Sequence, residues 1–247
     1  MSYIEIKKTK SNSYASFVKK VSFMGDLYII KKAMGQHSSG TNKEKFLLDN
    51  LEEITKEELE FRKKYLKEVG FLISHNDNLP EEIETASIRL NNLFEAKSCQ
   101  EKVDIEFAKE FIFNSNNIEG SKIPPHVVRE IIDRGDTAYA DKNEVKEVKN
   151  SILAFEYLKK SFKLNIVSIK RLYYILTKDL EMQKGVYYPK GFKKVQNVVG
   201  NFITTAPEHV EIALLDLLRW YKQNKNKIHP LILAFDFHKR YEKIHPF

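Results

Sequence analysis

His229–Phe247 reads HPLILAFDFHKRYEKIHPF and has the pattern of a helix followed by a short His-Pro-Phe ending. Pro230 suits the first turn of a helix, because its missing N–H would have no intrahelical partner there. Side chains that recur every three to four residues lie on one face of a helix. Four members of the stretch have this spacing: Leu231, Phe235, His238 and Tyr241. The pattern predicts a helix with this face buried and His238 as a hydrogen-bonded core residue, followed by His245, Pro246 and Phe247.

The composition is typical of a globular protein without a membrane span. The 247 residues are 42% hydrophobic and 12% aromatic, which is enough to bury a sizeable core. No run approaches the roughly 18 apolar residues of a membrane helix, and the opening MSYIEIKKTK lacks the apolar centre of a secretory signal. The single cysteine, Cys99, excludes an internal disulfide. We therefore expect a cytoplasmic protein that does not bind membranes.

The positive charge is concentrated at the N-terminus. The net charge is +7, and the first forty residues hold seven lysines against Glu5 and Asp26. Such a segment can bind nucleic acid or another polyanion. The same lysines can also form an ordinary solvated face, which we favour because the segment has no arginine. Nucleic acid is therefore an unlikely partner, although polyanion binding by these residues stays open.

The chain changes in character near residue 41. Residues 3–33 alternate loosely and are rich in Tyr, Ile, Val and Phe, which predicts two or three short antiparallel strands. Residues 1–40 are thus expected to be a small β-rich appendage and linker, followed by a helical region over 41–104. Within that region, Thr55 to Glu58 fits a capping box at a helix start. The predicted fold class is mainly α, with a small N-terminal β appendage.

Two later stretches carry recognisable patterns. A helix within residues 105–132 is expected to end at Ser115-Asn116-Asn117-Ile118-Glu119-Gly120, where Gly120 can close the helix in a left-handed conformation. Gly185–Phe202 is punctuated by glycine and aromatic residues and predicts a surface hairpin. Its partly alternating centre is formed by Lys194, Val195, Gln196 and Asn197.

The ending IHPF after a helix resembles the Fic (Fido) domain, whose signature is H-x-F-x-[D/E]-G-N-G-R-x-x-R. His245, Pro246 and Phe247 supply its opening, after which the 247 residues end. Ser115, Glu119 and Gly120 match [S/T]-x-x-x-E-[G/N], the inhibitory helix of many Fic proteins, in the order that the family has. The resemblance implies that residues 105–247 form a Fic-type helical core with a β-hairpin flap at residues 185–202, in which residues 194–197 would dock the target.

The resemblance also implies an activity. Fic proteins mostly transfer AMP from ATP to a Ser, Thr or Tyr hydroxyl of a protein, so ATP, Mg²⁺ and a hydroxyl-bearing protein substrate are expected for the complete domain. His245 would be the general base, a role that suits imidazole because its pKa lies near neutrality. Glu119, oriented by Ser115, would inhibit the enzyme by pairing with the second arginine of the signature. The flap would dock the target by strand pairing.

The acidic residue, the Gly-Asn-Gly turn and the two arginines of the signature are not among the 247 residues. We therefore expect an adenylyltransferase that is autoinhibited through Glu119 in complete form and inactive as truncated, with no credible ATP or metal site of its own. Loss of the following helix would expose an apolar face and favour a homo-oligomer. The alternative function is a non-catalytic protein-binding or regulatory module derived from a Fic domain.

Overall fold

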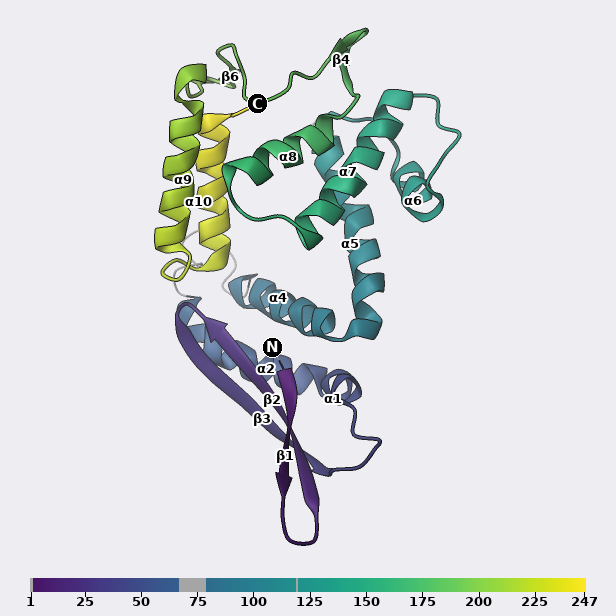
Figure 1. Ribbon diagram of the computed structural model, residues 1–247, viewed down its shortest axis with the longest axis vertical. Coiled ribbons are helices and arrows are strands. Elements are labelled where there is room, and N and C mark those ends of the chain that lie inside the picture. Colours follow the sequence, from purple (N-terminus) through teal and green to yellow (C-terminus); the bar gives the residue numbers. More distant parts are fainter. Residues whose placement is uncertain (1, 67–78, 119) are drawn as a thin grey trace. The chain divides into compact units, whose positions relative to one another are not determined.

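The computed structural model describes residues 2–66, 79–118 and 120–247, which form two compact units (Figure 1). One unit comprises residues 1–103 and 223–235, and the other comprises residues 104–222 and 236–247. The first unit combines a sheet with helices, whereas the second is mainly helical. The predicted fold class, mainly α with a small N-terminal β element, is confirmed. The domain division at residues 40 and 104 stays a prediction.

The N-terminal strands form one antiparallel sheet in the order β1-β2-β3. Its strands are β1 (Ser2–Lys8), β2 (Ser13–Phe23) and β3 (Asp26–Gln36). The turn between β2 and β3 is Met24-Gly25, and both residues have positive φ, at 53° and 87°. Two central residues with positive φ are typical of the type I′ turn, whose twist matches that of the strands. The strands predicted for residues 3–33 are therefore present, and two of them are longer than expected.

One face of this sheet packs on helices of the same unit. These are α1 (Lys43–Asp49), α2 (Leu51–Arg62) and α4 (Leu79–Glu95), with the short 3₁₀ helix η1 (Lys63–Tyr65) after α2. Alternate residues of a strand point to the same face, and here that face carries Phe17, Val21 and Ile30. The three side chains pack with Leu47 and Ile54 of α1 and α2. Burying side chains of this size stabilises the fold by about 1.5–3 kcal/mol each.

The capping box predicted at Thr55 is wrong. Helix α2 begins at Leu51, after Asn50, so Thr55 lies in its second turn and is buried. Glu58, one turn later, is also buried and accepts a hydrogen bond from the Lys19 ammonium at 2.7 Å. Thr55 and Glu58 both lie on the buried side of α2. Their hydrogen-bond partners there, Asn92 and Lys19, are distant in the sequence.

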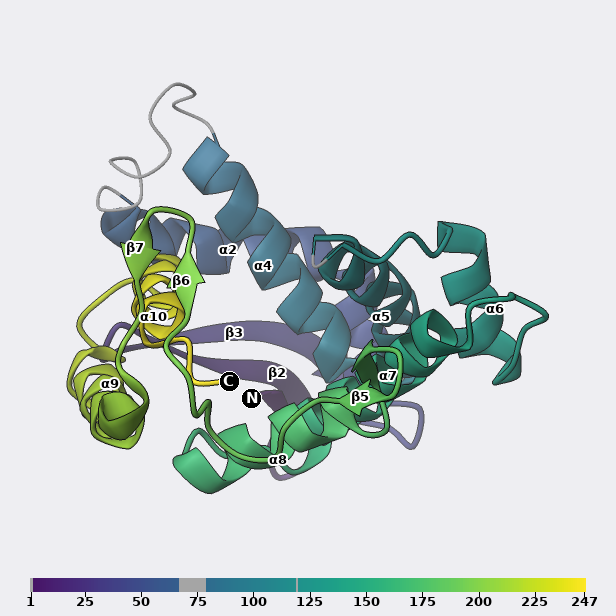
Figure 2. The ribbon, with the colours of Figure 1, turned by 90° about the horizontal axis from the view of Figure 1, so that it is seen from above.

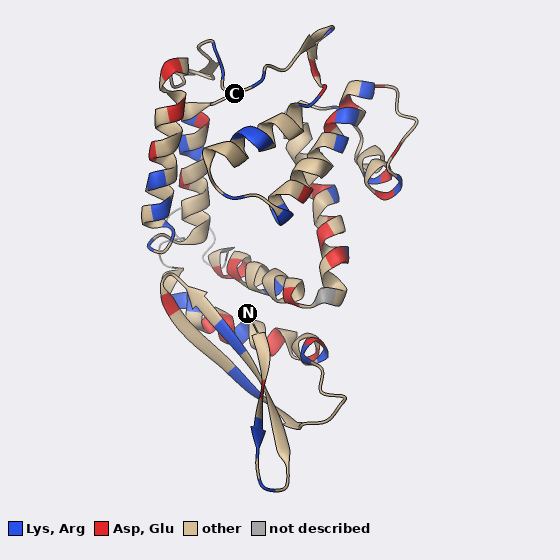
Figure 3. Cartoon of the chain, viewed as in Figure 1, with Lys and Arg blue, Asp and Glu red and all other residues tan. Residues whose placement is uncertain are grey.

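Several N-terminal lysines pair with acidic side chains of the same unit. Lys32 contacts Glu53 and Glu57 of α2, each at 2.8 Å, and Lys31 pairs with Glu5 on β1. Figure 3 shows the corresponding distribution, with Lys and Arg on the strands and acidic residues on α2 and α4. Part of the N-terminal positive charge is thus neutralised within the unit. Polyanion binding by the remaining lysines stays a prediction.

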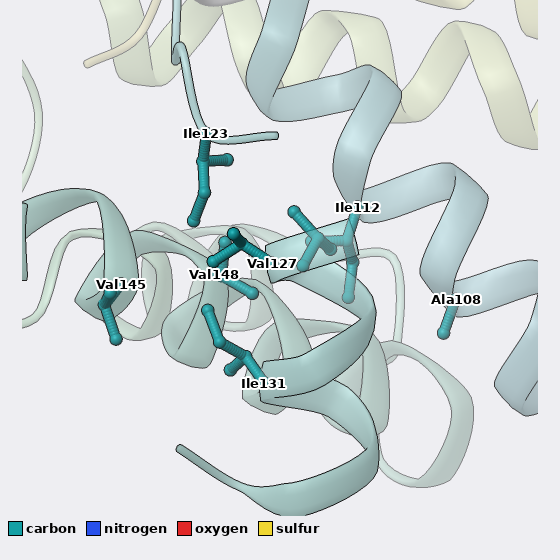
Figure 4. Close-up of a cluster of buried hydrophobic side chains, with 8 residues drawn as sticks. Ala108, Ile112, Ile123, Val127, Ile131, Val145 and Val148 are labelled. Carbon is teal, nitrogen blue, oxygen red and sulfur yellow. The ribbon is translucent and has the colours of Figure 1, made fainter. Parts of the chain in front are cut away.

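Three helices of the second unit surround a buried aliphatic cluster (Figure 4). They are α5 (Lys97–Ile118), which enters the unit at Asp104, α6 (Pro125–Arg134) and α7 (Lys142–Lys160). Helix α8 (Ile166–Thr177) packs against α7. The labelled members of the cluster are Ala108, Ile112, Ile123, Val127, Ile131, Val145 and Val148. Asn165 caps α8 by accepting the Ser168 N–H at 2.8 Å, as its sequence position predicts.

Helices α9 (Val210–Asn224) and α10 (Pro230–Ile244) lie side by side (Figures 1 and 2). Phe237, Tyr241 and Ile244 of α10 pack with residues of α9 that include Leu214 and Leu217. This burial raises the pKa of Tyr241 to about 12, because the charged phenolate loses its hydration. The packed stripe decides which side of α10 faces the protein.

The buried face predicted for α10 is therefore largely wrong. Leu231 is 37% exposed and Phe235 is 53% exposed. The side chain of His238 is 71% exposed and pairs with Glu242 at 3.1 Å, so it is not a core residue. The helix carries two apolar stripes, and the periodicity of the sequence does not say which of them packs on α9.

Short strands occupy the segment between α8 and α9. They are β4 (Glu181–Gln183) with β5 (Val186–Tyr187), and β6 (Val198–Val199) with β7 (Phe202–Ile203), followed by the 3₁₀ helix η2 (Pro207–His209). Among the described residues, no helix is both long enough and apolar enough to cross a membrane.

Candidate active site at the end of helix α10

His245 stands where α10 ends, and its backbone is in an unusual conformation. Its φ is +47°, in the left-handed region that costs a residue with a Cβ atom roughly 1–2 kcal/mol. The following residue is Pro246, which further restricts the backbone of the residue before it. The His245 N–H still donates to the Tyr241 carbonyl at 2.9 Å. Such a conformation persists only where the surrounding structure holds it.

Lys193 contacts the chain on both sides of His245. Its backbone N–H donates to the Pro246 carbonyl at 2.9 Å, and its ammonium donates to the Ile244 carbonyl at 3.1 Å. Lys193 is 6% exposed. Burial lowers the pKa of Lys193, because the ammonium is partly removed from water. The two bonds fix the peptide group that precedes His245 and the one that follows Pro246, so they hold the chain on either side of the candidate base.

The same segment holds two more carbonyls of the α10 ending. The Thr205 N–H donates to the Lys243 carbonyl at 3.0 Å, and the Asn197 side-chain amide donates to the Phe247 carbonyl at 3.4 Å. The last carbonyls of a helix have no intrahelical donor. Residues 193–205 therefore supply the missing donors and tie the HPF ending to the segment before α9. We call these residues the carbonyl clamp.

Thr204 joins the parts of the carbonyl clamp and is 4% exposed. Its hydroxyl accepts from the Lys193 ammonium at 2.5 Å and donates to the Asn197 carbonyl at 2.9 Å. Its own carbonyl accepts from the Gln196 side-chain amide at 2.7 Å. The polar groups around Lys193 are thus satisfied by one another, which is what buried polar groups require.

The hairpin β6–β7 projects from the carbonyl clamp (Figure 2). Its turn is Gly200-Asn201, and Gly200 has φ +57°, as expected for the first central residue of a type II′ turn. Val198 and Ile203 pair across the hairpin and are 64% and 74% exposed. The hairpin therefore presents apolar side chains and short, open strand edges.

The four residues predicted to form the flap divide into two groups. Lys194 and Val195 are exposed, with Val195 at 72%. Gln196 and Asn197 instead donate from their side-chain amides, Gln196 to the Thr204 carbonyl and Asn197 to the Phe247 carbonyl. All four precede β6, so they lie beside the hairpin and not in its strands. Their role in docking a target stays a prediction.

A cavity of about 530 Å³ lies beside the HPF ending. Phe247 forms part of its wall and stacks on Tyr173 of α8, with 4.0 Å between ring centroids and 3° between ring planes. Ser115, from the last turn of α5, lines the same cavity. The other lining residues are Phe162, Leu164, Ile169, Leu172, Leu176, Phe237, His238 and Tyr241. The structure therefore brings Ser115 and Phe247 to one cavity.

The end of α5 has the geometry of a Schellman cap. Gly120 has φ +100°, and its N–H donates to the Asn117 carbonyl at 3.1 Å. The Ser121 N–H donates to the Asn116 carbonyl at 3.0 Å, which completes the motif. The left-handed cap predicted at Gly120 is confirmed. Glu119 lies outside the described residues, so its inhibitory role stays a prediction.

Lys193 and Thr204 were not identified from the sequence. Lys193 precedes Lys194, and the two differ only in burial, which depends on residues near 244 in the chain. A weak signal was present in the position of the pair, because it lies directly before the segment predicted as a hairpin. In the part of the chain that the structure describes, no group of three or more His, Cys, Asp or Glu residues could hold a metal ion.

Comparisons with known proteins agree with this arrangement. Residues 163–247 match the family model described as the Fic/DOC family. The chain is similar to the crystal structure of a Fic family protein from Desulfovibrio desulfuricans G20, with 20% sequence identity and a TM-score of 0.53. The match covers 64% of this chain and 50% of that chain, so this chain spans about half the length of the solved protein. No curated protein matches. The segment that is similar to the Fic/DOC family thus contains α10 and ends with His245, Pro246 and Phe247.

Proposed function

We propose that this chain carries the proton-accepting side of a Fic-type protein adenylyltransferase, which transfers AMP from ATP to a Ser, Thr or Tyr hydroxyl of a protein. The observation that carries the proposal is the left-handed backbone of His245, which the carbonyl clamp holds beside an exposed hairpin. Backbone strain of this kind concentrates at functional sites. The match of residues 163–247 to the Fic/DOC family supports the same reading.

His245 would accept the proton of the target hydroxyl as its oxygen attacks. A general base must lie within about 2.6–3.2 Å of the proton donor, directly or through one water. A fixed backbone at His245 reduces the number of positions that its imidazole can take. The carbonyl clamp would therefore contribute to the reaction by orientation and not by proton transfer.

The hairpin would hold the target next to His245. Its strands β6 and β7 are short and leave open edges, and Val195, Val198 and Ile203 are exposed beside them. An extended peptide can add to such an edge through backbone hydrogen bonds, while side-chain contacts supply selectivity. The substrate would therefore present its hydroxyl on an extended segment with small apolar neighbours.

ATP and Mg²⁺ would be held by residues that the Fic signature places after its His-x-Phe opening. Within the described ranges, no acidic or histidine cluster offers ligands for Mg²⁺, which prefers carboxylates. The residues that the Fic signature places after Phe247 are also outside these 247 residues. The enzymatic proposal therefore concerns a protein in which those residues follow Phe247.

The end of α5 would regulate the site. Ser115 lines the cavity beside Phe247, and Glu119 follows one turn later in the sequence. A carboxylate there would form a bidentate pair with an arginine of the signature. Such a pair is stronger than a neutral hydrogen bond and takes up one edge of the guanidinium through two parallel N–H···O bonds. Glu119 would thereby prevent productive binding of ATP.

The test begins with the coding sequence downstream of the codon for Phe247. The remaining signature, x-[D/E]-G-N-G-R-x-x-R, would begin with the residue directly after Phe247. If the downstream sequence encodes it in frame, the longer chain should incorporate label from [α-³²P]ATP into protein. Glu119→Gly should raise incorporation, and His245→Ala should abolish it. His126→Ala is the matched control, because His126 is exposed on α6 and is not among the residues that line the cavity beside Phe247, so it should leave incorporation unchanged. Absence of incorporation in Glu119→Gly, or incorporation that does not depend on His245, would contradict the proposal.

The second candidate is a non-catalytic protein-binding module, which the exposed apolar hairpin favours. Val198→Ser with Ile203→Ser should then weaken binding of an intact Fic-family protein, whereas His245→Ala should not. Dependence of function on His245 separates the two candidates.

Self-association through the exposed Leu231 and Phe235 face is a further proposal, and monomeric sedimentation at every protein concentration would contradict it.

A further inference from the structure

Lys193 is the buried member of the Lys193–Lys194 pair. Burying an ammonium is costly unless hydrogen bonds satisfy it, and the partners of Lys193 are the Ile244 carbonyl at 3.1 Å and the Thr204 hydroxyl at 2.5 Å. Within the described ranges, no salt bridge to a carboxylate involves Lys193. Neutral oxygens offset less of the cost of burying an ammonium than a carboxylate would, so the burial of Lys193 calls for an explanation beyond charge balance.

The position of the two acceptors suggests that explanation. The Ile244 carbonyl belongs to the peptide group that precedes His245, and the Pro246 carbonyl belongs to the one after Pro246. Lys193 binds the first through its ammonium and the second through its backbone N–H. One residue thus fixes the chain on both sides of the left-handed residue. Rotation about the backbone of His245 would break at least one of these bonds.

The end of α10 makes an ammonium especially suitable here. The last carbonyls of a helix carry a partial negative charge, which a cation stabilises. A lysine side chain can also bind such carbonyls directly. A neutral donor of the same reach would gain less from the helix end, and a methionine could not donate at all.

We propose that Lys193 is a positioning residue that holds His245 in its left-handed backbone conformation. Its importance for AMP transfer rests on the proposed function, whereas its effect on the backbone of His245 does not. Lys193 contacts the backbone on either side of His245 and not the reacting atoms, so it acts through His245. Thr204 supports it by accepting from the ammonium while donating to the Asn197 carbonyl.

The test is backbone NMR of the 247-residue chain, with Lys193→Met compared with Lys194→Met. Methionine keeps the length and apolar character of the lysine stem but removes the donor. The HN–Hα coupling and the Cα and Hα shifts of His245 report its φ. We expect Lys193→Met to lose the left-handed signature, or to show it in exchange with a second conformation. Lys194→Met should retain it, because Lys194 is exposed.

A left-handed His245 in Lys193→Met, with shifts equal to those of the parent, would overturn the proposal. Loss of all dispersed signals would indicate an unfolded variant, and Thr204→Val then decides. That variant keeps Lys193 but removes one of its two acceptors, so the His245 signals should broaden or shift. Unchanged His245 signals in Thr204→Val would equally overturn the proposal.

These measurements need neither nucleotide nor target, so they stand apart from the test of AMP transfer. A chain that never transfers AMP can still show the effect of Lys193 on His245, and the proposed function would fail alone. In a chain that does transfer AMP, Lys193→Met should lower kcat about 100-fold with KM for ATP unchanged, since misplacing a catalytic group by about 1 Å has an effect of this size. A raised KM for ATP with unchanged kcat would contradict the positioning role of Lys193.

Discussion

The two units of the molecule bury positive charge in different ways. In the first unit, Lys19 and Arg62 lie against the buried carboxylates of Glu58 and Glu84. In the second unit, Lys193 lies against a carbonyl and a hydroxyl, both neutral. The first arrangement balances charge between the sheet and helices α2 and α4, whereas the second directs a cation at one helix end. The difference separates a charge network that supports the fold from a lysine that fixes a local backbone.

His229 extends the network of the first unit to the start of α10. Its Nδ1 accepts the Leu231 N–H at 3.3 Å, and its Nε2 lies 3.3 Å from a Glu84 carboxylate oxygen. An accepting Nδ1 requires the proton to be on Nε2. The imidazole therefore caps α10 with one nitrogen and faces Glu84 with the other. His229, which directly precedes α10, is thus also a buried member of the charge network.

The largest expected effect comes from breaking the network at Glu58. Glu58→Gln leaves Lys19 and Arg62 without a carboxylate that both contact, and removing one partner of a buried ion pair costs about 3–5 kcal/mol. Denaturation in guanidinium chloride measures the change. Glu60→Gln is the control on the same helix, since its pair with Lys63 is exposed and exposed pairs contribute little. Equal midpoints for Glu58→Gln and the parent would show that the network is not needed for stability.

A smaller loss of stability is expected for Lys193→Met. The Ile244 carbonyl and the Thr204 hydroxyl lose a charged donor, and hydrogen bonds to charged groups contribute about 1.5–3 kcal/mol each before the gain from removing a buried charge is subtracted. We expect a net loss of about 1–2 kcal/mol by the same measure, with Lys194→Met unchanged. A loss as large as that of Glu58→Gln would erase the distinction between the two regions.

The stability of the first unit should depend on pH through the buried carboxyl of Glu84. Burial raises the pKa of Glu84, but its contacts with His229 and Arg62 outweigh burial and leave that pKa below its ordinary value of 4.5. A carboxyl with a lowered pKa in the folded state stabilises the protein above the unfolded pKa, and this contribution is lost as the pH falls through the lowered value. Thermal unfolding between pH 6 and pH 3 should therefore show falling stability. The slope should be flatter in Glu84→Gln, and an unchanged slope would remove Glu84 as its cause.

The smallest effect is expected at the aromatic side of the network. The Arg62 guanidinium carbon lies 4.3 Å from the Phe23 ring centroid, and the two are buried or nearly so. Desolvated cation–π contacts contribute about 1–2 kcal/mol, so Phe23→Leu should lower the unfolding free energy by about that amount. Tyr3→Leu removes the more exposed contact with Lys20, at 5.8 Å, and should change stability less. A reversed order would show that ring packing, and not the cation, dominates at Phe23.

Features set by neighbours in the chain were predictable. Asn165 caps α8 and Gly120 closes α5, because capping depends on residues within one turn. The strands of the N-terminal sheet follow from alternation and turn residues in the same way. The HPF ending of the candidate site was recognisable because it is a contiguous motif.

Features set by distant residues were not predictable. Thr55 and Glu58 fit a capping box, yet they lie inside α2 and face Asn92 and Lys19. The stripe of α10 that carries Phe235 is exposed, whereas the stripe that carries Phe237 packs on α9. In each instance two local patterns were equally good, and contacts across the fold decided between them.

The sequence by itself determined the element types, the helix ends at Gly120 and Asn165, and the position of His245 in a Fic-like ending, since these depend on short-range geometry. Only the tertiary structure decided that Lys193 is buried and Lys194 exposed, and that residues 193–205 hold the end of α10. The physical reason is that burial and hydrogen bonding of a side chain depend on groups far away in the chain. Lys193 and Ile244 are separated by 51 positions, and no local pattern records their meeting.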